Sequence, residues 1–185
     1  MDLYQIFITH NRPWSIREIL LFFVIFTAAA GFFYRRYKQG RIVMSQVVSG
    51  LLLLCFLAIV YGSTVFTRIP SLERTYEMKL FWSWKEVFRG NGEMLKEILL
   101  NMILLFPAGL LLPCAAGKKL SWKKGLAFGL FVSTVIEISQ LVLCRGLFEW
   151  DDILHNSLGC MAGCVVSKII FLKRTVCADI SDKGR

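Results

Sequence analysis

The segment Gly125–Cys144 reads GLAFGLFVSTVIEISQLVLC and is long and apolar enough to cross a bilayer, for which about 20 residues suffice. It nevertheless carries a glutamate, Glu137, in its interior. An acidic side chain at the centre of a membrane helix costs roughly 2.5–3.5 kcal/mol on insertion scales, and such residues usually pair or bind something polar. The segment therefore predicts a membrane fold and the region that carries function.

Four further apolar blocks of similar length flank this segment. The chain has 185 residues, of which 56% are hydrophobic and 19% charged, whereas a soluble domain has a charged fraction of about a quarter. We therefore predict an all-α integral membrane bundle that forms a single domain over residues 1–185. The predicted transmembrane helices are 16–34, 42–63, 95–114, 125–144 and 153–172.

The net charge of +9 is explained by membrane topology rather than by nucleic-acid binding. Lys and Arg concentrate in cytoplasmic loops, and with five helices the first loop, the third loop and the C-terminal tail share one side. These segments hold most of the cationic residues, which predicts a cytoplasmic C-terminus and an N-terminus outside. The residues are Arg35, Arg36, Lys38, Arg41, Lys118, Lys119, Lys123, Lys124, Lys173, Arg174, Lys183 and Arg185.

The six cysteines carry no functional signal, because they form neither a CxxC pair nor a zinc-ligand spacing. We expect no metal site and no cofactor. The long outer loop, in contrast, is rich in aromatic residues around Trp82. Its segment Tyr76–Phe88 is either an interfacial anchor, since Trp and Tyr collect at the membrane surface, or a hydrophobic lid over a site.

Polar residues follow one face of each of the last three predicted helices. Glu97 and Asn101 share a face at i, i+4, and Pro107 predicts a kink further along that helix. On the next helix a stripe runs through Ser133, Glu137, Gln140 and Cys144, and on the last through Asp152, Asn156, Gly159 and Gly163. We expect the last two stripes to face each other, with their polar ends at the outer surface.

Two further expectations concern the last helix. Asp151 or Asp152 suits its N-cap, where a carboxylate satisfies free N–H groups. Gly159 and Gly163 form a GxxxG pattern, which permits close helix approach and could also join subunits. Three acids, Glu137 with these two aspartates, stand against the single Arg145. This excess indicates a bound cation, a shared proton or a cationic ligand group, unless the cluster is a purely structural network.

Three stretches together resemble the VanZ-like family. They are Asn101–Gly109 (NMILLFPAG), Glu137–Gln140 (EISQ) and Arg145–Gly159 (RGLFEWDDILHNSLG), and Thr67-Arg68 with Phe81–Trp84 (FWSW) resembles the central-loop signature of that family. The similarity covers about residues 43–172. The proline of Phe106-Pro107-Ala108-Gly109 is shifted by one position from the usual Phe-x-Pro-x-Gly. The resemblance implies a multi-pass protein of the bacterial cell membrane and an association with resistance to the lipid-tailed glycopeptide teicoplanin.

Two functions fit these residues. The first is an accessory protein that binds a lipoglycopeptide or a lipid-linked wall precursor at the outer leaflet, without nucleic acid. Its candidate ligand-binding residues are Asn101, Glu137, Gln140, Arg145, Asp152, Asn156, Arg68 and Trp82. The second is a membrane enzyme acting on a lipid-linked wall precursor through Glu137, Asp151 and Asp152, as a general base or around a divalent cation, with Arg145 on a phosphate. The expected partners are membrane lipid, one of these ligands and, through Gly159 and Gly163, a second copy of the chain.

Overall fold

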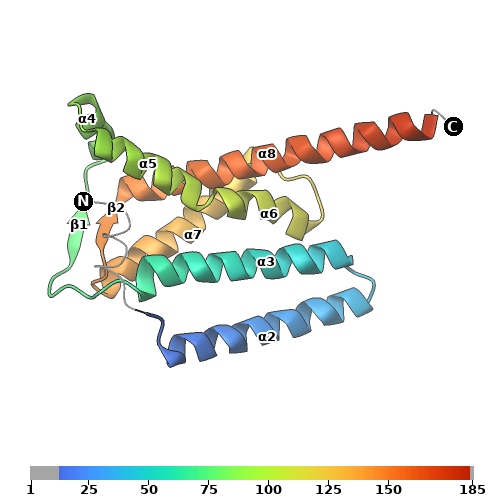
Figure 1. Ribbon diagram of the computed structural model, residues 1–185, viewed down its shortest axis with the longest axis horizontal. Coiled ribbons are helices and arrows are strands. Elements are labelled where there is room, and N and C mark those ends of the chain that lie inside the picture. Colours follow the sequence, from blue (N-terminus) through green and yellow to red (C-terminus); the bar gives the residue numbers. More distant parts are fainter. Residues whose placement is uncertain (1–12, 184–185) are drawn as a thin grey trace.

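A computed structural model describes the backbone of residues 13–183 and the side chains of residues 13–170 (Figure 1). The cationic tail residues 173, 174, 183 and 185 and the cysteine at 177 lie outside the described side chains. The chain is a bundle of helices with two three-residue strands. The elements are α2 (Ile16–Lys38), α3 (Met44–Tyr61), a π-helical turn η1 (Gly62–Phe66), β1 (Thr75–Glu77), α4 (Trp82–Phe88), α5 (Gly92–Leu104), α6 (Phe106–Ala116), α7 (Trp122–Val142), β2 (Leu147–Glu149) and α8 (Trp150–Lys183).

Within residues 13–183, five helices are long and apolar enough to cross a membrane, which confirms the predicted fold class. The candidate spans are Ile16–Lys38, Met44–Phe66, Gly92–Ala116, Trp122–Val142 and Trp150–Ile170. Each overlaps a predicted block, with ends shifted by up to four residues. The chain is therefore a membrane protein with several spans, because a helix of about 20 apolar residues matches the thickness of the hydrocarbon core.

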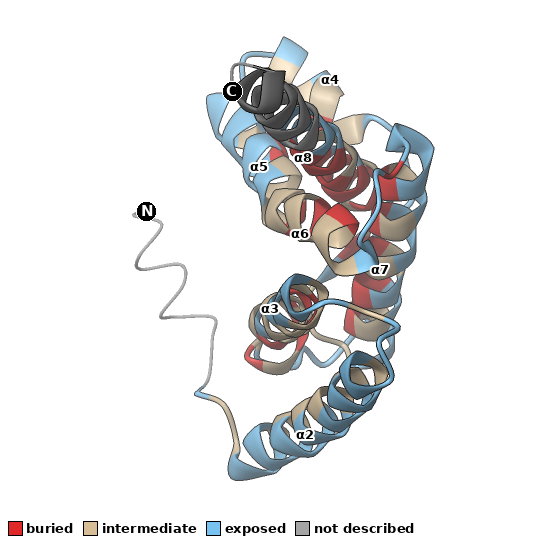
Figure 2. Cartoon of the chain, turned by 90° about the vertical axis from the view of Figure 1, so that its right-hand side faces the viewer, coloured by how far each residue is buried: buried red, intermediate tan, exposed pale blue. Residues whose placement is uncertain are grey.

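Helix α8 is the centre of the bundle. It packs against α5, α6 and α7, while α3 packs against α6, and α2 packs on α3. Burial follows this order, since buried residues gather on α8 and α7, and no residue of α2 is buried (Figure 2). The apolar side chains of α2 are instead exposed, as expected for a helix that faces lipid.

The third predicted helix is broken into two. Helix α5 ends at Leu104 and α6 begins at Phe106, with Pro107 in the first turn of α6. Proline has no N–H to donate and is tolerated in the first turn of a helix, so the predicted kink is a break with a proline start. Pro113, further along α6, is buried.

The glycines of α8 do not face the stripe on α7 as predicted. A Cβ at Gly159 would collide with the carbonyl of Met102, and one at Gly163 with the carbonyl of Phe106. Both glycines therefore approach the backbone of α5 and α6. The GxxxG face is used inside the chain, so a homo-oligomer of this protein would need a different surface.

Helix α7 contacts α8 through small residues of its own. A Cβ at Gly125 would come within 2.6 Å of the Cys164 Cβ, and one at Gly129 within 2.8 Å of the Cys160 Cβ. Both cysteines are buried at this contact. The face of α8 that meets α7 in the membrane interior is therefore made of small side chains next to the glycine pair.

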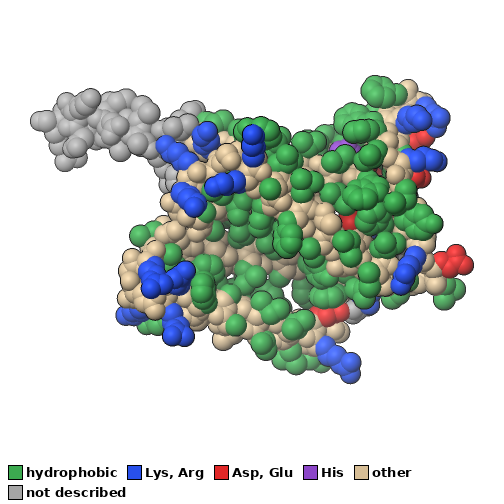
Figure 3. Space-filling view, turned by 180° about the vertical axis from the view of Figure 1, so that it is seen from behind, with side chains coloured by type: hydrophobic (Ala, Val, Ile, Leu, Met, Phe, Trp, Pro, Cys, Tyr) green, Lys and Arg blue, Asp and Glu red, His purple; other side chains and the backbone are tan. Residues whose placement is uncertain are grey.

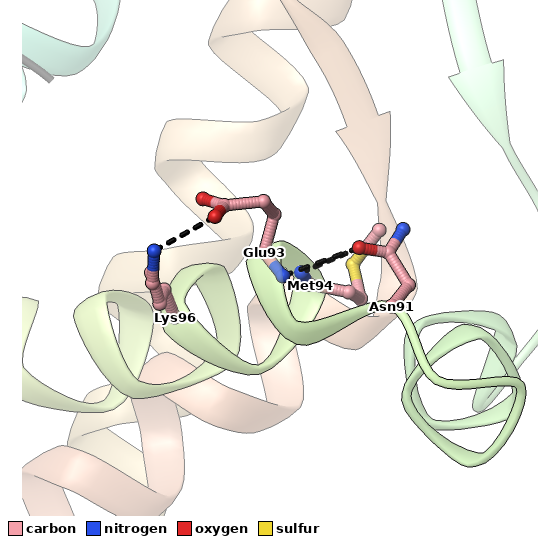
Figure 4. A network of polar contacts seen from close by, with 4 residues as sticks. All are labelled: Asn91, Glu93, Met94 and Lys96. Carbon is pink, nitrogen blue, oxygen red and sulfur yellow. Dashed lines mark hydrogen bonds and ion pairs between the residues drawn. The ribbon is translucent and has the colours of Figure 1, made fainter. Parts of the chain in front are cut away.

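One end of the bundle carries α4, the two strands, the end of α7 and the beginnings of α5 and α8; we call it the polar end (Figure 1). The strands pair in parallel, with Tyr76 opposite Phe148, and this pairing was not predicted. The predicted interfacial segment Tyr76–Phe88 consists of β1 and the short helix α4. At the start of α5, Asn91 accepts hydrogen bonds from the N–H groups of Glu93 and Met94 at 3.2 and 3.4 Å (Figure 4).

The opposite end of the bundle is basic. It holds the α2–α3 connection with Arg35, Arg36 and Lys38, and the α6–α7 connection with Lys118 and Lys119. Figure 3 shows Lys and Arg side chains at both ends of this face, whereas the visible Asp and Glu side chains lie toward the polar end, so the basic end has no visible acidic side chain to offset its cations. The charge asymmetry used to predict the topology is therefore present in the folded chain.

Candidate functional site

Asp151 is a structural residue rather than the N-cap of α8. It lies in the first turn of α8 and is 1% exposed. Its carboxylate accepts hydrogen bonds from the backbone N–H of Phe81 at 2.6 Å, the N–H of Ser83 at 3.0 Å and the Ser83 hydroxyl. The carboxylate therefore anchors the start of α4 on the start of α8, because free N–H groups at a helix start favour a negative charge.

Helix α4 is held by a second contact to α8. The indole N–H of Trp84 donates a hydrogen bond to Nε2 of His155 at 3.0 Å. Since α4 is tied down by Asp151 and His155, its exposed aromatic edge has a fixed position. Phe81 and Phe88 are 59% and 84% exposed, which suits an anchor in the membrane surface.

The side chains of Arg145 and Gln140 hydrogen-bond to the backbone of η1. The Arg145 guanidinium donates to the carbonyl oxygens of Val65 at 3.3 Å and Phe66 at 2.5 Å. The Gln140 amide donates to the carbonyl oxygen of Thr64 at 3.0 Å. These carbonyls belong to η1, where the π-helical geometry leaves backbone groups without their usual partners. Gln140 and Arg145 therefore hold the backbone of this turn, and their contact with a ligand stays a prediction.

Asp152 and Glu137 come together at the polar end from different helices. Asp152 accepts a hydrogen bond from the Asn101 amide of α5 at 2.5 Å. Glu137 is 2% exposed and accepts one from the backbone N–H of Glu149 at 3.0 Å. Each carboxylate has capacity for further donors, since an ionised carboxylate offers about four lone-pair sites.

Asn156 lies one turn further along α8 and faces α7. Its amide donates to the Ser133 hydroxyl at 2.9 Å, which confirms that these two polar faces meet. Asn156 is 2% exposed, and its Oδ1 has no hydrogen-bond partner. Buried polar atoms are nearly always satisfied, so this carbonyl oxygen is an acceptor without a donor in the interior of the polar cluster.

Arg68 is the cation of the cluster. It follows η1, is half-buried, and lies within electrostatic range of Glu137 and Asp152. Among the described side chains it forms no ion pair within 4 Å. A Cβ on Gly146 would meet the Arg68 guanidinium at 2.5 Å, and Gly146 has a φ of +119°, a conformation that favours glycine. Gly146 therefore makes room for the arginine.

Glu149 completes the cluster outside the membrane-spanning segments. Burial, together with the neighbouring charges of Asp152 and Glu97, raises its pKa to about 7, while the nearby Trp82 indole opposes the rise. The buried Trp82 N–H meets no acceptor at hydrogen-bonding geometry, so its effect is that of a nearby dipole. Glu149 and Glu97 were not among the predicted site residues. The i, i+4 spacing of Glu97 and Asn101 was the available signal for Glu97.

The site thus separates into two groups. Asp151, Gln140 and Arg145 stabilise the fold, and we call the remaining residues the head-group cluster: Arg68, Glu97, Asn101, Glu137, Glu149, Asp152 and Asn156. Among the described residues no group of three or more His, Cys, Asp or Glu side chains is arranged to hold a metal ion. The divalent-cation role considered for Glu137, Asp151 and Asp152 is therefore not met by their geometry.

The raised pKa of Glu149 predicts a pH dependence of stability. A carboxyl with a higher pKa in the folded chain than in the unfolded chain stabilises the fold while it is protonated. This contribution is complete below 4.5, the ordinary value, and is lost as the pH rises through about 7. We expect the melting temperature of the wild type in detergent to fall relative to Glu149→Gln over this pH range. Parallel melting curves across the range would contradict the prediction.

The comparisons identify the kind of chain that carries this arrangement. Residues 49–171 match the family described as VanZ/LLP1. No curated protein and no solved structure matches the chain. The matched range begins within α3 and ends within α8, and it includes every residue of the head-group cluster.

Proposed function

Since the chain belongs to the VanZ/LLP1 family, we propose that it is an accessory protein that binds the polar head of a lipid-linked envelope molecule. The molecule is a lipoglycopeptide such as teicoplanin or a lipid-linked wall precursor. The observation that carries the proposal is the position of Arg68, an arginine without an ion pair among the described side chains, beside Glu137 and Asp152. Around it are polar groups that still have hydrogen-bonding capacity.

The chemistry of the head-group cluster suits such a ligand. A guanidinium binds phosphate or carboxylate with two parallel hydrogen bonds. The carboxylates of Glu137 and Asp152 accept hydrogen bonds from hydroxyl and amino groups, which sugars and glycopeptides carry. The free Oδ1 of Asn156 is a further acceptor. A ligand with an anionic group would bind Arg68 through that group, and its hydroxyl or amino groups would donate hydrogen bonds to Glu137 and Asp152. The ligand would thus pair charges that form no ion pair within the described side chains.

The distribution of charge supports a site at the outer surface. Lys and Arg favour the cytoplasmic side of a membrane protein, and the basic end is the one opposite the head-group cluster. The cluster would then face outward in a bacterial cell membrane, with the N-terminus outside and the C-terminus in the cytoplasm. The exposed rings of Phe81 and Phe88 on α4 would lie in the outer interface, beside the entry of a membrane-anchored ligand.

Glu149 favours a second function, a membrane enzyme acting on the same class of ligand. A general base works best with a pKa near the working pH, and burial raises the pKa of Glu149 to about 7. Glu149 lies within electrostatic range of Asp152. In this version Glu149 replaces Asp151, which is engaged with α4, as the proton acceptor, while Arg68 holds the phosphate. Conversion of a labelled lipid-linked precursor by the purified protein, lost in Glu149→Gln, would favour the enzyme.

The test of the binding proposal is susceptibility to teicoplanin and vancomycin in a Gram-positive host at matched membrane levels of protein. We expect the wild type to shift teicoplanin susceptibility selectively, because the proposed ligand carries a lipid tail. Arg68→Gln and Glu137→Gln should abolish the shift. Arg74→Gln is the matched control, since Arg74 is an exposed arginine in the same loop.

Two results would contradict the proposal. One is a wild-type shift that Arg68→Gln leaves intact, because the anionic group would then bind elsewhere. The other is the absence of a shift in every strain together with unchanged pools of lipid-linked precursors in a deletion strain. Equal loss in Arg74→Gln would point to overall charge rather than to the cluster.

A further inference from the structure

A second feature of the chain lies outside the head-group cluster, in the membrane-spanning part. Helices α2, α3 and α7 line a partly open cavity of about 420 Å³. Its lining is apolar apart from Glu18, which lies in the first turn of α2 and takes part in the capping box there. The lining includes Trp14, Ala58, Tyr61, Phe66, Val132, Val135 and Ile136.

The cavity exists because α2 stands away from the rest of the bundle. Helix α2 packs on α3, and none of its residues is buried. Figure 3 shows the hollow between the helix at the lower edge and the body of the molecule. All three walls are candidate membrane spans. Most of the lining side chains are apolar and offer water few hydrogen-bond partners, so a hydrocarbon chain is the occupant that fits.

The cavity lies toward the polar end of the bundle. Trp14 precedes α2, Tyr61 ends α3, and Phe66 ends η1, and all three line the cavity. The rings of Tyr61 and Phe66 meet edge to face with centroids 5.1 Å apart. The Tyr61 hydroxyl donates to the Ser139 hydroxyl at 2.8 Å, which fixes this wall to α7. The wall is therefore rigid where the cavity approaches the head-group cluster.

The turn η1 connects the two sites. Its side chain Phe66 lines the cavity, its carbonyls are held by Gln140 and Arg145, and Arg68 follows two residues later. On α7, Ile136 lines the cavity and Glu137 belongs to the cluster. Neighbouring residues of two separate elements thus face the apolar space and the charged site. Single-turn π-helical insertions are frequent at functional sites.

From this juxtaposition we propose that the cavity between α2, α3 and α7 holds one hydrocarbon chain of a phosphate-headed lipid whose head binds at Arg68. The inference rests on the proposed function for the position of the head, and it adds the tail site and the chemical class of the ligand. The hydrocarbon chain of the lipid enters from the membrane between α2 and α7, because these two helices share no extended interface.

The test uses phosphatidic acid that carries a diazirine on its acyl chain, mixed into phosphatidylcholine nanodiscs that contain the purified full-length chain. Irradiation attaches the chain to the residues it touches, and peptide mapping locates the adducts. We expect adducts concentrated on Ala58, Val132 and Val135. Filling the cavity with Ala58→Trp should reduce them about tenfold, a loss of about 1.4 kcal/mol of binding.

Two further variants keep the test independent of folding. Val135→Trp fills the cavity from a side chain that is 41% exposed and therefore has room to adjust. Val48→Trp adds the same volume to α3 at a position that does not line the cavity and is 50% exposed. Val135→Trp should lose the adducts, and Val48→Trp should keep them with the melting temperature of the wild type. Adducts that follow exposure alone, equal on Val48, Ile59 and Ile138 and unchanged by either cavity variant, would overturn the inference.

Arg68→Gln separates failure of the tail site from failure of the head site. It should reduce labelling by the phosphatidic acid probe and leave labelling by a phosphatidylcholine with the same diazirine chain unchanged. Loss of labelling in Ala58→Trp but not in Arg68→Gln would support the tail site and contradict the position of the head at Arg68. The reverse result would support the head site and overturn the tail site.

Discussion

Gly159→Leu is expected to prevent stable folding of the chain. The Gly159 Cα lies against the carbonyl of Met102, and a Cβ there would overlap backbone rather than a side chain that can move. Separation of α8 from α5 would remove the contact that brings Asp152 to Asn101. We expect a loss of more than about 4 kcal/mol, the range that marks core disruption, measured as the melting temperature and the yield of monodisperse protein in detergent.

The matched control is Gly31→Leu in α2. Nothing lies within 4 Å of a Cβ at Gly31, and α2 is at the edge of the bundle. This variant should melt at or above the wild-type temperature, because replacing glycine within a helix adds helix propensity. A Gly159→Leu protein with wild-type stability would mean that α8 does not pack on α5 as closely as described here.

Asp151→Asn is expected to lower stability and Asp152→Asn to lower function, although the two residues are adjacent and the substitutions are identical. Asp151 accepts three hydrogen bonds from α4 and its preceding residue, and it is 1% exposed. Loss of its charge should destabilise the protein by about 1.5–3 kcal/mol, the usual contribution of hydrogen bonds to charged groups. The melting temperature in detergent should fall, and residues 81–88 should exchange their amide hydrogens faster.

Asp152→Asn should leave the melting temperature close to that of the wild type, because an asparagine oxygen can still accept from Asn101. It should nevertheless abolish the teicoplanin shift and weaken ligand binding, since it removes one of the carboxylates facing Arg68. Equal destabilisation by both variants would show that Asp152 is structural. Equal loss of function with unchanged stability would return Asp151 to the site.

Much of the site was visible in the spacing of polar residues, and the roles of individual residues were not. Ser133 and Asn156 were predicted to lie on facing helices, and they are hydrogen-bonded. Arg145, predicted as a ligand for phosphate, donates hydrogen bonds to the carbonyls of η1, a contact that was not predicted. No local sequence pattern predicts a π-helical turn. The hydrogen bonds that its carbonyl groups accept from Arg145 and Gln140 could therefore not be predicted from the sequence.

Arg68 and Arg145 also show that the sequence does not predict which cation is engaged within the fold. Arg145 was a candidate because it is the cation close to the acidic residues in the sequence, and Arg68 because Thr67-Arg68 resembles the central-loop signature of the family. Only the tertiary structure decides which guanidinium hydrogen-bonds to the backbone of η1. This turn lies 80 residues from Arg145 in the sequence. Likewise Asp151 and Asp152 are one residue apart, so their side chains point in different directions from α8, one to α4 and the other to α5.

The sequence by itself determined that this protein is a membrane bundle of five spans with a basic end and a polar end. The length of each apolar segment and the position of the charges can be read along the sequence. They decide which segments lie in lipid as helices and which lie in water. Only the tertiary structure decided which polar groups are satisfied within the fold and which stay open, because hydrogen bonds between helices depend on rotation and depth to within an ångström. It also decided that the glycines of α8 face α5 and α6, and that α2 stands off far enough to leave a cavity beside the site.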